Sequence, residues 1–91
     1  MKTRAALITG ASRGLGLALA NRLAELGWNL IIDARNSKAI EEAGKQLSKK
    51  TKVLSIPGDI TDPEHLQKLA KSAENFGGLD LVINNASTLG L

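Results

Sequence analysis

The 91-residue sequence contains no cysteine, which excludes a disulfide framework and a thiolate metal site and fits a reducing compartment. No apolar run approaches the ~20 residues that a membrane span needs. The first residues lead straight into a short strand-like run rather than a signal peptide. We therefore expect a cytoplasmic protein with no membrane partner, folded as at most one domain with a modest core.

Aromatic side chains are nearly absent, with one Trp, one Phe and no Tyr. The one dense basic cluster consists of Lys45, Lys49, Lys50 and Lys52, in a chain of net charge +3. Cations at the end of a predicted helix complement the helix dipole, and such a cluster is typical of a solvated helix terminus. Because nucleic-acid sites also need rings on which bases stack, we expect no nucleic-acid partner.

Apolar runs and glycines divide the chain into alternating strands and helices. Buried strands are expected at 5–9, 30–32, 53–56 and 79–83. Helices are expected from residue 15 to 26, from 37 to 50, and after an Asp62 cap with Pro63 at the first helical position. The expected buried stripes are Leu15, Leu19, Leu23 and Leu26 in the first helix and Leu66, Leu69, Ala70, Ala73 and Phe76 in the third.

The order β-α-β-α-β-α-β with apolar strands predicts an α/β fold with a parallel sheet. We expect a Rossmann-like sheet with strand order 3-2-1-4, in which residues 1–91 form an N-terminal dinucleotide-binding half, truncated after the fourth strand. Right-handed crossovers place the first two helices on one face and the third on the other. The fourth strand is then an apolar free edge, so we expect a homo-oligomer formed through this strand or the uncovered sheet face.

The loop after the first strand reads Thr9-Gly10-Ala11-Ser12-Arg13-Gly14-Leu15-Gly16. It leaves a buried strand and opens a helix, where free N–H groups and the helix dipole favour an anion. Gly10 permits the tight turn, Gly14 a close approach of the backbone to a pyrophosphate, and Gly16 close helix–strand packing. The alternative is a glycine-rich turn that binds nothing.

The glycine spacing fits neither G-x-G-x-x-G nor a Walker A loop. The spacing T-G-x-x-x-G-x-G resembles that of the short-chain dehydrogenase/reductase family. Three further motifs follow in the family's order: Asp59-Ile60, then the apolar strand at 79–83, then Asn84-Asn85-Ala86. The resemblance runs from residue 4 to residue 86.

The resemblance implies a dinucleotide site. Around the pyrophosphate and the adenosine ribose it places Gly10, Ser12, Arg13, Gly14, Leu15 and Gly16. It implies that Asp59 accepts a hydrogen bond from the adenine amino group, with Ile60 beside it, and that Asn85 and Ala86 lie along a ribose. The alternatives are a turn made by Asp59 and strand-end capping by Asn84 and Asn85. Ser87 stands where the family has Gly, whose backbone is freer.

The choice between NAD and NADP depends on the end of the second strand. The generic rule seeks an acid about 20 residues past the glycines, and Asp33 lies there. Arg35 follows on the same face of an extended segment. Measured from Gly27, NAD-using members of the resembled family place the acid where this chain has Ala34, and NADP-using members often have a basic residue where Arg35 stands. Arg13 and Arg35 together suit a 2′-phosphate, so we expect NADP rather than NAD. The alternative is an Asp33–Arg35 surface pair indifferent to the cofactor.

Catalysis in this family uses a tyrosine as general acid/base, assisted by a lysine four residues later. The sequence has no tyrosine, so we expect no catalytic residue and no activity of the 91-residue chain alone. It also shows no cluster of metal ligands, so we expect no metal site. His65 is expected to be a solvated residue, Asp80 a strand-start hydrogen-bonding group and Trp28 a packing or surface residue.

Two classes of function follow. The first is the NADP(H)-binding half of a reductase that transfers hydride between nicotinamide and a carbonyl or alcohol carbon. The second is a non-catalytic dinucleotide-binding or self-assembling module, complete at 91 residues. A nucleic-acid binder would instead lose affinity steeply with salt and ignore NADPH.

Overall fold

Strands and helices alternate throughout residues 3–86, the part of the chain that the computed structural model describes. The strands are β1 (Ala5–Ile8), β2 (Asn29–Ala34), β3 (Val53–Pro57) and β4 (Leu81–Ile83). The helices are α1 (Gly14–Glu25), α2 (Ser37–Leu47) and α3 (Pro63–Asn75). The predicted order of elements is confirmed, and Ser87 lies outside the described residues.

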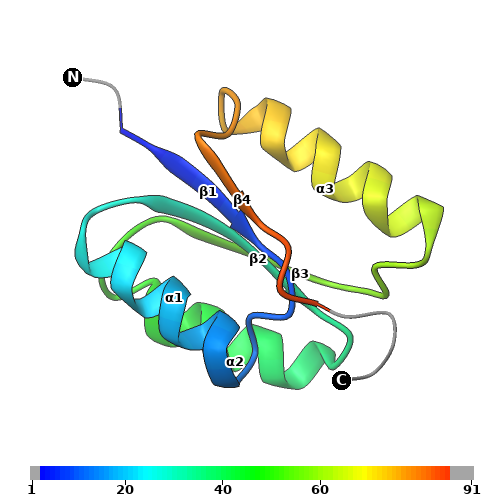
Figure 1. The fold of residues 1–91 in the computed structure, drawn as a ribbon, viewed down its shortest axis with the longest axis horizontal. Helices are drawn as coiled ribbons and strands as arrows, with labels where there is room; N and C mark the ends of the chain where they lie inside the picture. The colour runs from blue at the N-terminus through cyan, green and yellow to red at the C-terminus, as the bar shows by residue number, and fades with distance from the viewer. Residues whose placement is uncertain (1–2, 87–91) are drawn as a thin grey trace.

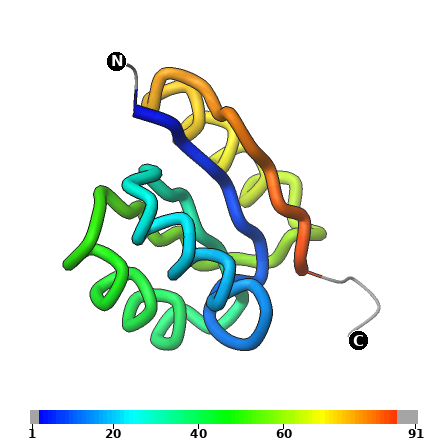
Figure 2. The backbone as a smooth tube through the Cα atoms, turned by 60° about the vertical axis from the view of Figure 1, so that its left-hand side comes forward, coloured from blue at the N-terminus to red at the C-terminus, as the bar shows by residue number. Residues whose placement is uncertain are grey.

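The strands form one parallel sheet in the order β3-β2-β1-β4, as predicted. Helices α1 and α2 cover one face of this sheet, and α3 lies across the other (Figure 1). Seen from a second direction, β1 and β4 run side by side, with β4 at the edge (Figure 2). The predicted Rossmann-like α/β fold is therefore confirmed.

Most element bounds differ from the expected ones by one to three residues, and two of these differences are explained by hydrogen bonds. Helix α2 ends at Leu47 rather than at residue 50, because the Lys50 N–H bonds the Leu47 carbonyl in a tightened last turn. Strand β4 begins at Leu81 rather than at residue 79. Asp80 bonds Ala5 through its backbone N–H, at 2.8 Å, and accepts from the Ala5 N–H at Oδ2, at 2.9 Å. The predicted strand-start hydrogen bond of Asp80 is thus confirmed.

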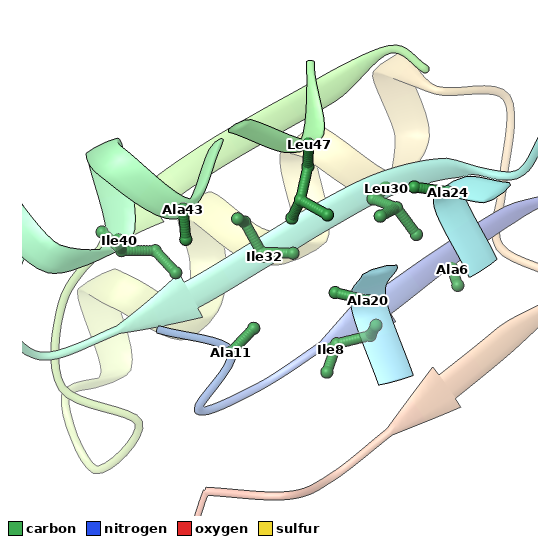
Figure 3. Packing of buried hydrophobic residues seen from close by; sticks show 10 residues of the cluster. All are labelled: Ala6, Ile8, Ala11, Ala20, Ala24, Leu30, Ile32, Ile40, Ala43 and Leu47. Carbon is green, nitrogen blue, oxygen red and sulfur yellow. The ribbon is translucent and has the colours of Figure 1, made fainter. Parts of the chain in front are cut away.

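The core fills the layer between the sheet and the α1/α2 face (Figure 3). It consists of aliphatic side chains and alanines: Ala6, Ile8, Ala11, Ala20, Ala24, Leu30, Ile32, Ile40, Ala43 and Leu47. Trp28 packs against this cluster and carries Arg4 over its ring, which confirms the predicted packing role.

The buried stripe predicted for α1 is wrong. Leu15 and Leu26 are 67% and 59% exposed, and Leu19 and Leu23 are half-buried. The innermost positions are instead Gly16, Ala20 and Ala24. Small residues let the helix lie close to the sheet, so the leucines flank the contact rather than form it.

The stripe predicted for α3 is wrong in part. His65 and Leu69 are buried, and Ala73 and Phe76 are half-buried, whereas Leu66 and Ala70 are exposed. Helix α3 is the only helix of the described residues on its face of the sheet (Figure 1). One flank of its apolar surface therefore has no neighbour in residues 3–86.

Candidate functional site

A groove of about 700 Å³ opens where the loops following the strands gather. Its walls come from four loops of the described chain, those after β1, β2, β3 and β4. The lining residues are Gly10, Ser12, Arg13, Gly14, Asp33, Ala34, Arg35, Asn36, Ala39, Gly58, Asp59, Ile60, Thr61, Asn85 and Ala86. In parallel α/β sheets this edge is the usual place for a ligand.

The glycine loop is held tightly against the end of β4. Gly10 has a φ of +66°, and a Cβ there would lie 3.1 Å from the Ala86 backbone. A Cβ on Gly16 would overlap the Gly10 carbonyl oxygen and lie 2.7 Å from Asn85 Nδ2. Gly14 has a φ of +60° with open space around it, on the groove side of the loop. The two positions favour glycine for different reasons: Gly16 has no room for a side chain, and Gly14 has a backbone conformation that other residues rarely adopt.

Hydrogen bonds join the ends of β1 and β4. The buried Thr9 hydroxyl donates to Asn84 Oδ1 and accepts from the Ala86 N–H at 2.9 Å. The Asn85 side-chain amide donates to the Gly10 carbonyl at 3.0 Å. Asn84 and Asn85 therefore act as the strand-end links considered from the sequence, and Asn85 also lines the groove.

The N-terminus of α1 differs from those of the other described helices. Asn36 caps α2 by accepting from the Ala39 N–H, and Asp62 caps α3 by accepting from the Glu64 N–H. Helix α1 has Arg13 at its N-cap with no side-chain cap hydrogen bond, and no acid in its first turn. Its first N–H groups and the positive end of its dipole therefore face the groove without an internal anion.

Asp33 does not form a surface pair with Arg35. Asp33 is 1% exposed at the end of β2, and its Oδ1 accepts from the Gly10 N–H at 2.9 Å. The Asp33 backbone carbonyl accepts from the Ala11 N–H, so this residue holds the glycine loop from two atoms. Arg35 is exposed and lines the groove together with Arg13.

The expectation for His65 is wrong. His65 is 3% exposed, and its Nε2 lies 2.7 Å from Asp33 Oδ2. Periodicity places residue 65 at the margin of the helix stripe, but it does not reveal a polar partner 32 positions away. The signal available in the sequence was an acid, Asp33, directly after the apolar run 30–32, together with the one histidine in the first turn of the third expected helix.

With this geometry in view, the sequence relationships are decisive. Residues 4–90 match the family of short chain dehydrogenases. The chain belongs to the short-chain dehydrogenase family.

Individual members of this family show how closely the chain follows them. It is 37% identical over 92 residues to 1-deoxy-11-beta-hydroxypentalenate dehydrogenase of Streptomyces exfoliatus, covering 99% of this chain and 34% of that protein. The structure matches L-sorbose reductase of Gluconobacter frateurii, complexed with NADPH and L-sorbose, with a TM-score of 0.89 and 35% identity over 97% of this chain and 35% of that one. A short-chain dehydrogenase of Sphingobium yanoikuyae in complex with NADPH matches with a TM-score of 0.81 and 29% identity, over 92% of this chain and 34% of that one.

The chain thus spans about a third of the length of the relatives it matches. Within residues 3–86, no helix is both long and apolar enough to cross a membrane. The same residues contain no group of three or more His, Cys, Asp or Glu side chains arranged to hold a metal ion.

Most of the residues predicted to bind a dinucleotide lie together in the groove. They are Gly10, Ser12, Arg13, Gly14, Arg35, Asp59, Ile60, Asn85 and Ala86. Leu15 and Gly16 do not line it, since Leu15 points to solvent and Gly16 lies beneath the loop. Six further residues line the groove that the sequence did not predict as site residues: Asp33, Ala34, Asn36, Ala39, Gly58 and Thr61. All of them except Ala39 lie within two positions of a predicted site residue.

Asp59 makes the turn that the sequence allowed and also lines the groove. Its Oδ1 accepts from the Thr61 N–H at 2.9 Å and from the Thr61 hydroxyl at 2.8 Å. These hydrogen bonds, the backbone one foremost, lower the pKa of the Asp59 carboxyl below its usual value, and the Arg35 charge acts in the same direction. Asp59 is therefore ionised at neutral pH, with lone pairs left to accept from a ligand.

Replacing Thr61 with valine is expected to raise the pKa of Asp59 part of the way to its ordinary value, because the hydroxyl donor is lost and the N–H remains. A lowered carboxyl pKa stabilises the fold above the pKa of the unfolded chain, and this is lost as pH falls through the folded value. The variant's stability deficit should therefore disappear in acid. Carbon-13 titration of the Asp59 carboxyl measures the shift, and Thr51→Val, whose hydroxyl donates to Asn29, is the matched control.

Proposed function

We propose that residues 1–91 are the N-terminal dinucleotide-binding half of a short-chain oxidoreductase, with NADP(H) as the cofactor. The whole protein would transfer hydride between the nicotinamide and the carbon of a carbonyl or alcohol substrate. In this proposal the groove holds the adenosine and pyrophosphate part of the cofactor. The cytoplasmic location expected from the sequence stays a prediction.

One observation supports the choice of cofactor: both groove arginines are exposed, whereas the Asp33 carboxylate is buried and hydrogen-bonded within the protein. Arg13 and Arg35 line the groove, and the two carboxylate oxygens of Asp33 contact the Gly10 N–H and His65 Nε2. Guanidinium groups donate paired hydrogen bonds to a dianionic phosphate. The NADPH bound in the two matched structures supports the same choice for this chain.

The other residues have roles that follow from their places. The uncapped first turn of α1, from Gly14 through Leu15 to Gly16, would offer N–H groups to the pyrophosphate, with Ser12 beside them. Asp59 would accept from the adenine amino group beside Ile60. Asn85 and Ala86, held at the end of β4, would lie along a ribose of the cofactor.

Cofactor fluorescence tests this proposal. NADPH should bind at one saturable site, and adenosine 2′,5′-bisphosphate should displace it far more strongly than 5′-AMP does, because only the former carries the 2′-phosphate. Equal displacement by both nucleotides would count against NADP(H). In addition, the protein isolated from its natural source should oxidise NADPH when it is supplied with carbonyl compounds.

A second proposal concerns assembly: a second copy of the chain would pair with the edge strand β4. Leu81 and Val82 of this strand are 37% and 57% exposed. An apolar strand edge with unpaired N–H and C=O groups is a template for another chain. Pairing through β4 is also compatible with the second class of function, a non-catalytic dinucleotide-binding module.

Val82→Lys is expected to weaken self-association by about tenfold or more, because it puts a charge in the middle of the apolar edge. Sedimentation velocity over a concentration series measures this. Leu26→Lys is the matched control, since Leu26 is 59% exposed and is the C-cap residue of α1 rather than part of the edge strand. A wild-type chain that sediments as a monomer at every concentration would refute the assembly proposal.

A further inference from the structure

Asp33 stands where the generic rule puts the acid that selects NAD, yet its carboxylate is engaged by the protein itself. We propose that His65 determines cofactor specificity: by holding Asp33 against the glycine loop, it keeps a free acid away from the 2′ position of the adenosine ribose. This inference rests on the proposed function, because it concerns how the same groove distinguishes NADP(H) from NAD(H).

The geometry leaves the Asp33 carboxylate no free face. Oδ1 accepts from the Gly10 N–H at 2.9 Å, and Oδ2 lies 2.7 Å from His65 Nε2. The side chains of His65 and Asp33 are only 3% and 2% exposed. Since an ionised carboxylate can only accept, the proton of this contact is assigned to Nε2. Both oxygens are thus turned into the fold by donors from two different elements.

Gly58 leaves the space that the His65 ring occupies. A Cβ on Gly58 would overlap the His65 ring at Nδ1, so only glycine at the end of β3 lets the ring reach Asp33. His65 lies in the first turn of α3, on the sheet face opposite α1 and α2 (Figure 1). Its Nδ1 is a buried atom without a hydrogen-bond partner in the described chain. Burying a polar atom without a partner lowers stability, so of the two ring nitrogens only Nε2 makes a stabilising contact.

Releasing Asp33 would change the charge of the groove at the point that separates the cofactors. Asp33 and Arg35 both line the groove and are separated by one residue at the end of β2. A free Asp33 carboxylate would compete with a phosphate for Arg35, repel the phosphate, and offer an acceptor to a ribose 2′-hydroxyl. Losing the His65 donor should therefore weaken NADPH binding and strengthen NADH binding relative to it.

The experiment measures the ratio of the NADH and NADPH dissociation constants by fluorescence titration. The ratio of the NADH constant to the NADPH constant should fall about tenfold in His65→Leu. A change of this size is what repulsion between one freed carboxylate and the 2′-phosphate would produce. His65→Gln, whose side-chain amide can still donate to Asp33, should keep the wild-type ratio. Adding Asp33→Asn to His65→Leu should restore the preference for NADPH, since the uncharged amide does not repel a phosphate.

The ratio separates specificity from stability, because both cofactors bind the same folded fraction. Gly58→Ala, which pushes the ring aside without changing His65, should shift the ratio in the same direction and serves if His65→Leu folds poorly. An unchanged ratio in a folded His65→Leu or Gly58→Ala chain overturns the inference while leaving NADP(H) binding intact. A wild-type chain that binds neither cofactor overturns this inference and the proposed function together.

Discussion

Gly16→Val is expected to lower the free energy of unfolding by roughly 3 kcal/mol and to abolish NADPH binding. A Cβ at this position overlaps the carbonyl oxygen of Gly10 and approaches Asn85 Nδ2, so α1 must move away from the loop. Both obstacles belong to atoms that the fold holds in place: the Gly10 carbonyl accepts the Asn85 amide, and Asn85 follows β4. The groove therefore loses its shape together with its stability.

Ala18→Val provides the control for this substitution. Ala18 lies in the same helix and is exposed, so valine there adds a β-branched side chain without a steric conflict. Its cost should be limited to helix propensity, about 0.5 kcal/mol. Urea denaturation of both variants measures the difference. A Gly16→Val chain as stable as Ala18→Val would show that α1 does not contact the loop as described.

Removing both groove arginines should produce the largest change in cofactor binding. Charge-assisted hydrogen bonds contribute about 1.5–3 kcal/mol each, so Arg13→Ala with Arg35→Ala should weaken NADPH binding by at least about a hundredfold. NADH has no 2′-phosphate, and its affinity should change by less than about threefold. Calorimetric titration of each cofactor measures both constants.

Arg22→Ala is the matched control for the arginine variants. Arg22 lies in the last turn of α1 and approaches Glu25 at 3.9 Å on the exposed surface, so its removal changes the net charge without touching the groove. If Arg22→Ala weakened NADPH binding as much as Arg13→Ala, the arginines would act through net charge alone. If the double variant bound both cofactors equally less well, the 2′-phosphate assignment would be wrong.

The fold could be predicted because each signal in the sequence was local. Apolar runs three to five residues long, the Asp62-Pro63 helix start and the glycine stops each depend on near neighbours, and together they predict the order of elements. The strand order then follows from the right-handed crossovers of a Rossmann-like sheet. The glycine loop was equally readable, since its position between strand and helix is a local property.

The errors arose where tertiary packing overrides the pattern. Hydrophobicity alone favours Leu15 over Gly16 as a buried residue, but α1 lies so close to the loop that only the smallest residues fit beneath it. His65 and Asp33 are polar and distant in sequence, and their burial becomes reasonable only once they are seen to pair. The Asp33–Arg35 surface pair, which the sequence left open as an alternative, does not form for the same reason, since Asp33 is buried.

The central claim is that the groove beside the glycine loop binds NADP(H). Amide proton–nitrogen spectra recorded while NADPH is added test it most directly. The account predicts saturable shifts at Gly10, Ser12, Gly14, Arg35 and Thr61, around the groove, with larger changes near Arg35 for NADPH than for NADH. Shifts confined to the exposed basic residues at the end of α2, or no saturable shift at all, would contradict it.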